Sequence, residues 1–285
     1  MTPQAQASSL WTRLPLTLRA IVSGLLIGMI AANVWPVLLL SLGAKFAIVA
    51  ELIFLALYLW WARGGGPPAS LQAARAQAFR RSKLSSQQWF WGVLAALFFA
   101  ATIHSSLVLL FRLVAYPVAA FREGYDLSIV PSRALKWVVV VISAASAGIC
   151  EETGFRGYMQ QPIEQRRGAP LAIFTSSLFF MALHLSKAWA IPAMVPIVFG
   201  AGVLLGLMAW SARSLVPCIM GHTLMDIGLF AYWWTGIAGE FRARPITETG
   251  IDAPFLIALA LFAASLAVVL FAVWKLRKET PEVSS

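Results

Sequence analysis

Residues 135–156 read LKWVVVVISAASAGICEETGFR, an apolar run that ends in two adjacent acids, Glu151 and Glu152, followed by Arg156. The apolar residues of this run are suited to a lipid environment, whereas the charged residues at its end are not. A charged side chain at the centre of a bilayer costs from about 2.5 to more than about 10 kcal/mol, depending on the method. Two adjacent acids in such a run therefore require a counter-charge, a hydrated cavity or a chemical role. The rest of the chain supplies candidates for all three.

Composition identifies the class of protein. Hydrophobic residues make up 60% of the 285 residues and charged residues only 12%, against about 45–50% and 25% in soluble domains. We therefore expect an integral membrane protein. Its net charge of +10 is assigned to basic loops beside anionic lipid headgroups rather than to nucleic acid, because lysine and arginine lie mostly between the apolar runs. Cys150 and Cys218 lie inside apolar runs and outside any CxxC pair, which argues against a disulfide framework or a cysteine zinc site.

Apolar stretches of about 20 residues predict an all-α polytopic transmembrane helix bundle of about eight spans. The spans are expected at residues 20–42, 45–62, 89–114, 134 to beyond 156, 171–187, 192–210, 215–234 and 253–274. The first should break near Pro36, and the fourth should continue past the lipid toward a turn at residues 166–170. We divide the chain into N-terminal spans at 1–133, a core of four spans at 134–234, and a final span with a basic tail at 235–285.

The loops suggest how the chain sits in the membrane. Gly64, Gly65 and Gly66 with the two prolines that follow should stop a helix. The stretch 70–88 then carries four basic residues among apolar ones, which is typical of a segment lying on the membrane surface. Lysine and arginine are more numerous on the side of the termini, so both termini are expected in the cytoplasm.

Three later positions extend the acidic pair into a constellation. Glu151 lies about 16 residues before the turn at 167–168 and His184 about 16 after it. In an antiparallel helix pair, equal distance from the turn gives equal depth, so these side chains can face each other. Glu152 can pair with Arg156 at i,i+4, which leaves Glu151, about 100° round the helix, free.

His222 and Asp226 form a second i,i+4 pair in a later span. A carboxylate beside a histidine can activate water, and a second histidine with a polar partner can stabilise the oxyanion that follows. Alternatively, Glu151, His184 and His222 could hold zinc, because two histidines and one glutamate form a known catalytic ligand set. The chain has neither His-Glu-x-x-His nor Gly-x-Ser-x-Gly.

The motifs Glu151-Glu152-x-x-x-Arg156, Phe180-x-x-x-His184 and His222-x-x-x-Asp226 resemble those of the CPBP family. These are the CAAX-processing and bacteriocin-processing intramembrane proteases of the Abi or Rce type. The resemblance covers about residues 138–230. It implies an intramembrane protease, glutamate-type or metal-dependent, with a membrane-associated peptide or protein substrate that in some relatives is prenylated. By the same resemblance, the chain is expected in a bacterial inner membrane.

The resemblance also implies roles for the matched residues. Glu151 and His184 would activate the attacking water, and His222 with Asp226 would form the oxyanion hole. Asp226 is a departure, because an ionised aspartate accepts hydrogen bonds and cannot donate one to an oxyanion. Asp226 would have to be protonated, orient His222 or bind a metal.

Other interpretations remain open from the sequence. The acids and Arg156 could form a structural ion cluster, and the chain could be a catalytically silent immunity or scaffold protein that binds a peptide or partner. A proton-coupled transporter is disfavoured because no inverted repeat is visible. We interpret His104, beside Ser105, as a hydrogen-bonding residue between helices. Glu51 has no partner visible in the sequence.

Overall fold

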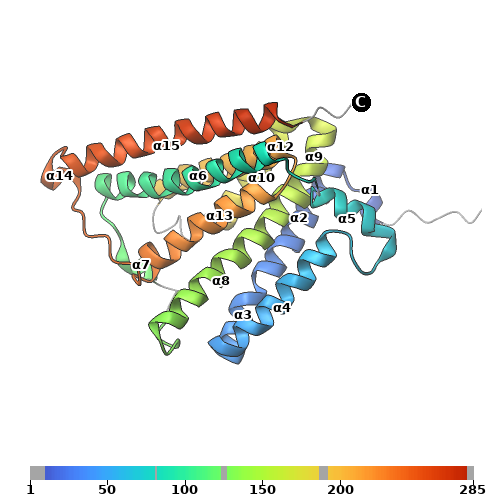
Figure 1. Cartoon of the computed structure of the whole chain (residues 1–285), viewed down its shortest axis with the longest axis horizontal. Helices are drawn as coiled ribbons and strands as arrows, with labels where there is room; N and C mark the ends of the chain where they lie inside the picture. Colours follow the sequence, from blue (N-terminus) through green and yellow to red (C-terminus); the bar gives the residue numbers. More distant parts are fainter. Residues whose placement is uncertain (1–9, 81, 123–126, 186–191, 281–285) are drawn as a thin grey trace, which may run out of the picture.

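The computed structural model describes residues 10–80, 82–122, 127–185 and 192–280, and every regular element in this part of the chain is helical (Figure 1). The α-helices are α1 (Leu10–Arg13), α2 (Leu16–Ala32), α3 (Val34–Leu42), α4 (Ala44–Ala62), α5 (Gln72–Ala78), α6 (Ser86–Leu113), α7 (Val118–Arg122), α8 (Arg133–Glu152), α9 (Gln161–Arg167), α10 (Ala169–Leu183), α12 (Val195–Ala212), α13 (Val216–Gly228), α14 (Ile246–Thr249) and α15 (Ala253–Lys278). Short 3₁₀ turns are η1 (Ala69–Leu71) and η3 (Pro192–Met194), and π-helices are η2 (Thr153–Gln160) and η4 (Leu229–Trp234).

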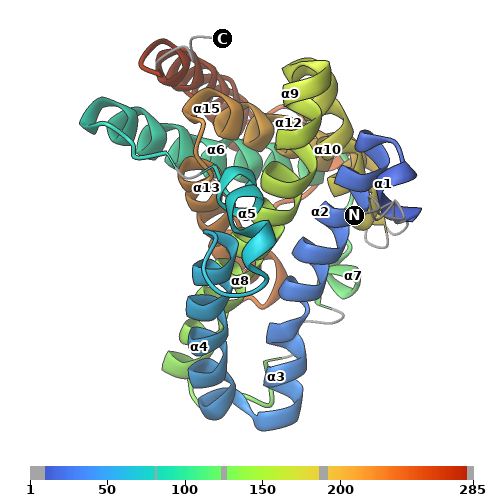
Figure 2. The same cartoon turned by 90° about the vertical axis from the view of Figure 1, so that its right-hand side faces the viewer.

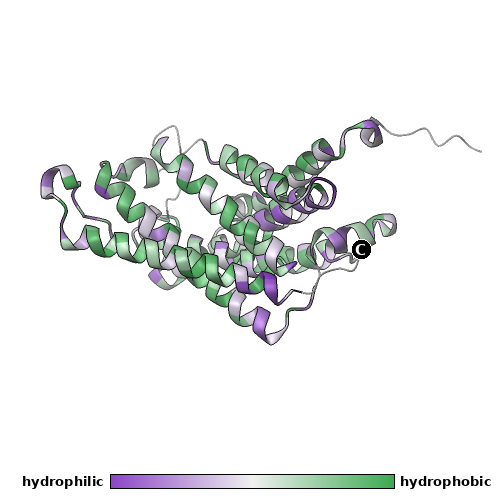
Figure 3. Cartoon of the chain, turned by 90° about the horizontal axis from the view of Figure 1, so that it is seen from above, coloured by the Kyte–Doolittle hydropathy of each residue, from purple (hydrophilic) through white to green (hydrophobic). Residues whose placement is uncertain are grey.

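The predicted fold class is confirmed, and all eight predicted spans coincide with helices. Among the described residues, six helical stretches are long and apolar enough to cross a membrane: Leu16–Leu42, Ala44–Ala62, Ser86–Leu113, Arg133–Arg167, Pro192–Ala212 and Ala253–Lys278. The other two predicted spans are the shorter helix α10 and the α13–η4 helix. Hydrophobic colour covers the long helices, and hydrophilic colour gathers near helix ends and in connecting segments (Figure 3). The end predicted for the fifth span, residue 187, lies outside the described residues.

The first span breaks where a proline requires it. Helix α2 ends and α3 begins at Asn33, three residues before Pro36. Proline has no backbone N–H, and its ring clashes with the carbonyl four residues earlier, here that of Ala32, so the helix cannot run through unbroken. The Asn33 side chain donates to the Met29 carbonyl at 2.7 Å and covers an acceptor at the end of α2. Figure 2 shows α3 and α4 projecting together from the body of the molecule.

The helix of the fourth span continues to the predicted turn, but it is not a uniform α-helix. Helices α8, η2 and α9 form one stretch of 35 residues, which ends at Gly168 with φ +85°. Its middle part, Thr153–Gln160, is π-helical. Wide π turns are rare and are frequently found at functional sites. The sequence pattern does not predict this π-helix, which follows Glu152 directly.

Helix α2 packs against the π-helix through glycine. A Cβ built on Gly154 would lie 2.5 Å from the Gly24 carbonyl oxygen and 2.6 Å from the Gly28 Cα. Glycines at i and i+4 let two helices in a membrane approach until their backbones touch. The pair Gly24 and Gly28 therefore fixes the position of η2 relative to the first span.

Replacing Gly154 by alanine is expected to lower the free energy of unfolding by about 1–3 kcal/mol, because the added methyl group overlaps backbone atoms that cannot rotate away. The matched control is Gly200→Ala on α12, where a Cβ meets nothing within 4 Å. That change should be neutral or stabilise by up to about 1 kcal/mol, since alanine is the better helix former. Denaturant unfolding in mixed micelles measures both. Equal stability of the two variants would mean that the α2–η2 contact is not tight.

The interior on the far side of α8 is formed by α6, α13 and α15. Helix α15 runs alongside α6, and α13 packs against both α6 and α8 (Figure 1). Small side chains, including Ala95 and Ala96, are fully buried on α6. His104 on α6 accepts from Trp233 Nε1 at 3.1 Å through Nδ1 and bonds the Met225 carbonyl at 3.1 Å through Nε2. The interhelical role predicted for His104 is thus confirmed, and these bonds hold α13 in place.

Two expectations about charged residues need revision. The segment 70–88 was expected to present its basic residues at the membrane surface, but Arg75 and Arg80 are buried in protein, with 2% and 8% of their surface exposed. Arg75 donates to four backbone carbonyls around the loop after α4, and Arg80 pairs with Glu164 at 2.6 Å. Glu51, without a partner in the sequence, is fully buried and accepts a hydrogen bond from Ser146 at 2.7 Å.

Candidate active site

Four of the six predicted site residues line one cavity. The cavity has a volume of about 250 Å³, and its polar wall is formed by Glu151 from α8, His184 at the end of α10, and His222 and Asp226 from α13. The other lining residues are apolar or aromatic: Ile103, Leu107, Ala147, Phe180, Met194, Ile197, Val198, Ala201, Met225, Leu229, Phe230 and Trp234. The arrangement concentrates acid and imidazole groups on one side of an apolar pocket.

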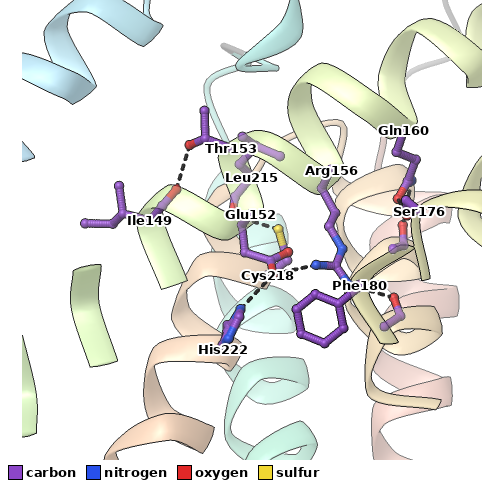
Figure 4. Close-up of polar contacts among 12 residues, drawn as sticks. Ile149, Glu152, Thr153, Arg156, Gln160, Ser176, Phe180, Leu215, Cys218 and His222 are labelled. Atoms are coloured by element: carbon purple, nitrogen blue, oxygen red, sulfur yellow. Dashed lines mark hydrogen bonds and ion pairs between the residues drawn. The ribbon is translucent and has the colours of Figure 1, made fainter. Parts of the chain in front are cut away.

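Glu152 and Arg156 lie behind this wall. Arg156 Nη1 and Glu152 Oε1 are 2.7 Å apart, and both side chains are completely buried. Arg156 Nη2 donates to the Gly202 carbonyl of α12 at 3.0 Å, and the guanidinium lies 4.7 Å above the centre of the Phe180 ring. Figure 4 shows the arginine extended between the carboxylate and the aromatic ring. The i,i+4 pair predicted from the sequence is therefore confirmed, and it is held from three sides.

His222 connects this buried pair to the cavity. Its Nδ1 is 2.7 Å from Glu152 Oε1, and its Nε2 is 3.4 Å from Asp226 Oδ2. Figure 4 shows the Glu152 carboxylate bonded to both Arg156 and His222. Glu152 fixes the ring orientation by accepting the Nδ1 proton. Because both ring nitrogens face carboxylates, the ring carries a proton on each of them, and the Nε2–H group, only loosely engaged by Asp226, remains available to another acceptor.

His222 reaches the depth of Glu152 although it lies near the start of helix α13. His222 lies only seven residues beyond Leu215, which places it shallow if α13 begins at the membrane surface. However, Leu215 is 1% exposed, and Pro217 and Cys218 are also buried. Helix α13 thus begins inside the bundle, and His222 reaches the depth of Glu152 within two turns.

A backbone carbonyl determines which ring nitrogen of His184 carries the proton. Helix α10 ends at Leu183, and His184 is the residue that caps it. Its Nδ1 is 2.7 Å from the Phe180 carbonyl oxygen. A carbonyl can only accept, so Nδ1 carries the proton, and Nε2 of the neutral ring holds a lone pair. His184 therefore offers a proton acceptor at the edge of the cavity.

Glu151 is the acid that remains unpaired. It lines the cavity, and its Oε2 is buried with no hydrogen-bond partner among the described residues. A buried acceptor without a partner is costly and marks a place where a water molecule is favourable. His184 and His222 are both close enough to interact electrostatically with its carboxyl group. The structure thus separates the two adjacent acids, with Glu152 in the buried pair and Glu151 at the cavity.

Several supporting groups were not identified from the sequence. Gln160, one π turn beyond Arg156, donates to the Gly206 carbonyl at 3.0 Å and accepts from Ser176 at 3.3 Å, as Figure 4 shows in part. The acceptors Gly202 and Gly206 are spaced i,i+4 on α12. That glycine spacing was the available signal, because it predicts a helix face that another helix can approach closely.

The sequence offers Glu151, His184 and His222 as an alternative set of zinc ligands. Among the residues that the structure describes, no three His, Cys, Asp or Glu side chains form a group able to hold a metal ion. Nδ1 of His184 and Nδ1 of His222 both face oxygen acceptors, which is also the arrangement of histidines that bind a metal through Nε2.

Comparison with known proteins bears on this region of the chain. Residues 133–228 match the family model described as type II CAAX prenyl endopeptidase Rce1-like. No match to the chain was found among curated proteins or among solved structures. The matched segment contains α8, η2, α9, α10, α12 and α13, the elements that carry the six site residues. The resemblance predicted from the three motifs is confirmed, and it points to a protease of the CAAX type in an integral membrane protein.

Proposed function

We propose that the protein is an intramembrane endopeptidase that hydrolyses a peptide bond of a membrane-associated peptide or protein. The observation that carries the proposal is the difference in environment between the two adjacent acids. Glu152 is neutralised by Arg156, while Glu151 faces a cavity that it shares with His184 and His222. A site built only for stability would pair both acids, because an unpaired buried charge is costly.

In this proposal Glu151 and His184 act on water. A water molecule donates hydrogen bonds to the Glu151 carboxylate and to Nε2 of His184, and its oxygen attacks the carbonyl carbon of the substrate. The proton that the water loses passes to Glu151 as the new C–O bond forms. Collapse of the tetrahedral intermediate breaks the C–N bond, and the same proton passes to the leaving amine. The products are a carboxylic acid and an amine, and the enzyme returns to its starting state.

His222 stabilises the oxyanion in the intermediate. Its Nε2–H faces the cavity side and is only weakly engaged at 3.4 Å by Asp226. Donors that are already oriented before reaction stabilise developing charge strongly in a site that excludes water. Of the three roles open to Asp226, orientation of His222 is the one the geometry supports. Arg156 and Glu152 are positioning residues, because they act through His222.

The surroundings also suggest the substrate and its approach. The apolar walls favour a substrate with a hydrophobic side chain next to the scissile bond, and a prenylated CAAX-type tail is the substrate class that the family match suggests. We further propose a bacterial inner membrane location with both termini in the cytoplasm. The excess of basic residues on the side of the termini supports this orientation.

The test is cleavage of a library of lipid-anchored and unmodified peptides by the purified full-length protein, with and without a chelator. We expect cleavage that persists in chelator and that falls by about 10²–10⁴-fold in His184→Gln, which removes the basic nitrogen that holds the attacking water. Lys83→Gln, an exposed change outside the cavity, serves as the control. Absence of cleavage by the wild-type protein, or equal rates for wild type and His184→Gln, would contradict the proposal.

A further inference from the structure

A second pocket lies at the end of the long helix that carries the acidic pair, away from the cavity. It has a volume of about 300 Å³ and is lined by six residues: Pro15, Leu16, Thr17, Arg19, Arg166 and Arg167. Half of the lining residues are arginines, and none is acidic. Arg19 comes from the first turns of α2, whereas Arg166 and Arg167 end α9. Sequence-distant segments thus bring three guanidinium groups to one pocket.

These three arginines differ from the buried arginines of the protein. Arg75, Arg80, Arg112 and Arg156 each donate to a carbonyl or a carboxylate. Among the described residues, the exposed side chains of Arg166 and Arg167 make no hydrogen bond or ion pair, and Nε of Arg19 is buried without a partner. A buried donor left unsatisfied costs about 1–3 kcal/mol, and more for a charged group. The unsatisfied Nε of Arg19, next to two further arginines without a counter-charge, therefore favours an anion in this pocket.

The position of the pocket indicates which anions can reach it. Helix α2 begins at Leu16 and α9 ends at Arg167, and these are the corresponding ends of two membrane-spanning stretches that pack together. Figures 1 and 2 show α9 and the start of α2 at the same end of the molecule. The pocket thus lies at the level where phospholipid headgroups meet water. The first turn of α2 also has no side-chain cap, so its free N–H groups add to the positive potential.

From this geometry we infer that the Arg19–Arg166–Arg167 pocket binds a phosphate group, as carried by an anionic phospholipid headgroup or by a soluble phosphate. Guanidinium groups match phosphate oxygens in geometry and bond them through paired donors. The bound phosphate bridges α2 to α9. Because α2 packs on Gly154 and α9 continues η2, this bridge fixes the π-helix from its outer end.

The inference does not depend on the proposed peptidase activity, and its test measures stability. The full-length protein is unfolded thermally in nanodiscs of phosphatidylcholine alone, in nanodiscs with added phosphatidylglycerol, and in phosphatidylcholine with inorganic phosphate. We expect a saturable rise in Tm of a few degrees with phosphatidylglycerol. A rise with phosphatidylglycerol alone identifies the headgroup as the source, and a rise with inorganic phosphate as well identifies a soluble ligand. Both results support the site.

The triple variant Arg19→Gln, Arg166→Gln, Arg167→Gln should lose this rise. The matched control is Lys83→Gln, Lys275→Gln, Lys278→Gln. It removes three positive charges from the side of the membrane to which we also assign the arginine pocket, and it should keep the rise in Tm. If the arginine variant does not fold, native mass spectrometry of the wild-type protein measures preferential retention of phosphatidylglycerol over phosphatidylcholine. No change in Tm with either ligand, equal loss in the control variant, or retention without preference would overturn the inference.

Discussion

Replacement of Glu151 by glutamine is expected to reduce peptide hydrolysis by about 10²–10⁴-fold, the usual contribution of a general base. Glutamine keeps the size of the side chain and can still bond a water molecule through its carbonyl oxygen. It cannot take a proton from that water, because an amide is not a base at neutral pH. The expected loss is therefore in kcat, with KM nearly unchanged, since substrate contacts with the apolar walls remain.

The stability of this variant separates a chemical role from a structural one. Glu151 Oε2 has no hydrogen-bond partner among the described residues, so its charge is not held in a hydrogen-bonded ion pair. Removing the charge should leave the free energy of unfolding unchanged or raise it. Glu248→Gln, on the exposed face of α14, is the matched control and should keep full activity. A Glu151→Gln protein that is as active as wild type would exclude the water-activating role.

The features of the site that follow from helix periodicity could be predicted from the sequence. The spacing of Glu152 and Arg156 predicted their pairing, and the equal distance of Glu151 and His184 from the turn predicted that they face the same space. Both predictions need only the rise and turn of a helix. The break near Pro36 followed in the same way from one missing N–H group.

The features that depend on contacts between distant segments could not be predicted. The bond between Glu152 and His222 joins residues 70 apart in the chain. The π-helix after Glu152 gives no signal in its residue pattern. Arg80 is 76 residues from the Arg156 carbonyl to which it donates at 3.2 Å, which is why a basic segment expected at the membrane surface is partly buried. Packing, rather than local preference, decides these positions.

Replacement of Arg156 by methionine is expected to lower the free energy of unfolding by about 3–5 kcal/mol, the cost of breaking a buried ion pair from one side. Methionine approximates the length of the arginine stem, so the main loss is the charge. Glu152 would lose its only arginine among the described residues and keep the contact with His222, and its Oε2 is already without a hydrogen-bond partner. The control is Arg244→Met, at an exposed arginine that makes no hydrogen bond or ion pair with the described residues, and it should change stability by less than about 0.5 kcal/mol.

The double variant Glu152→Gln, Arg156→Met distinguishes a cost in charge from a cost in packing. Glutamine removes the orphaned charge but still accepts the proton of His222 Nδ1, so the double variant should be more stable than Arg156→Met alone. Denaturant unfolding of the four proteins in this cycle gives the coupling energy directly. If Arg156→Met and the double variant lose the same stability relative to wild type, Arg156 contributes through its contacts with Phe180 and Gly202 rather than through Glu152. In that case the separation of the two acids, on which the catalytic proposal rests, would lose its electrostatic basis.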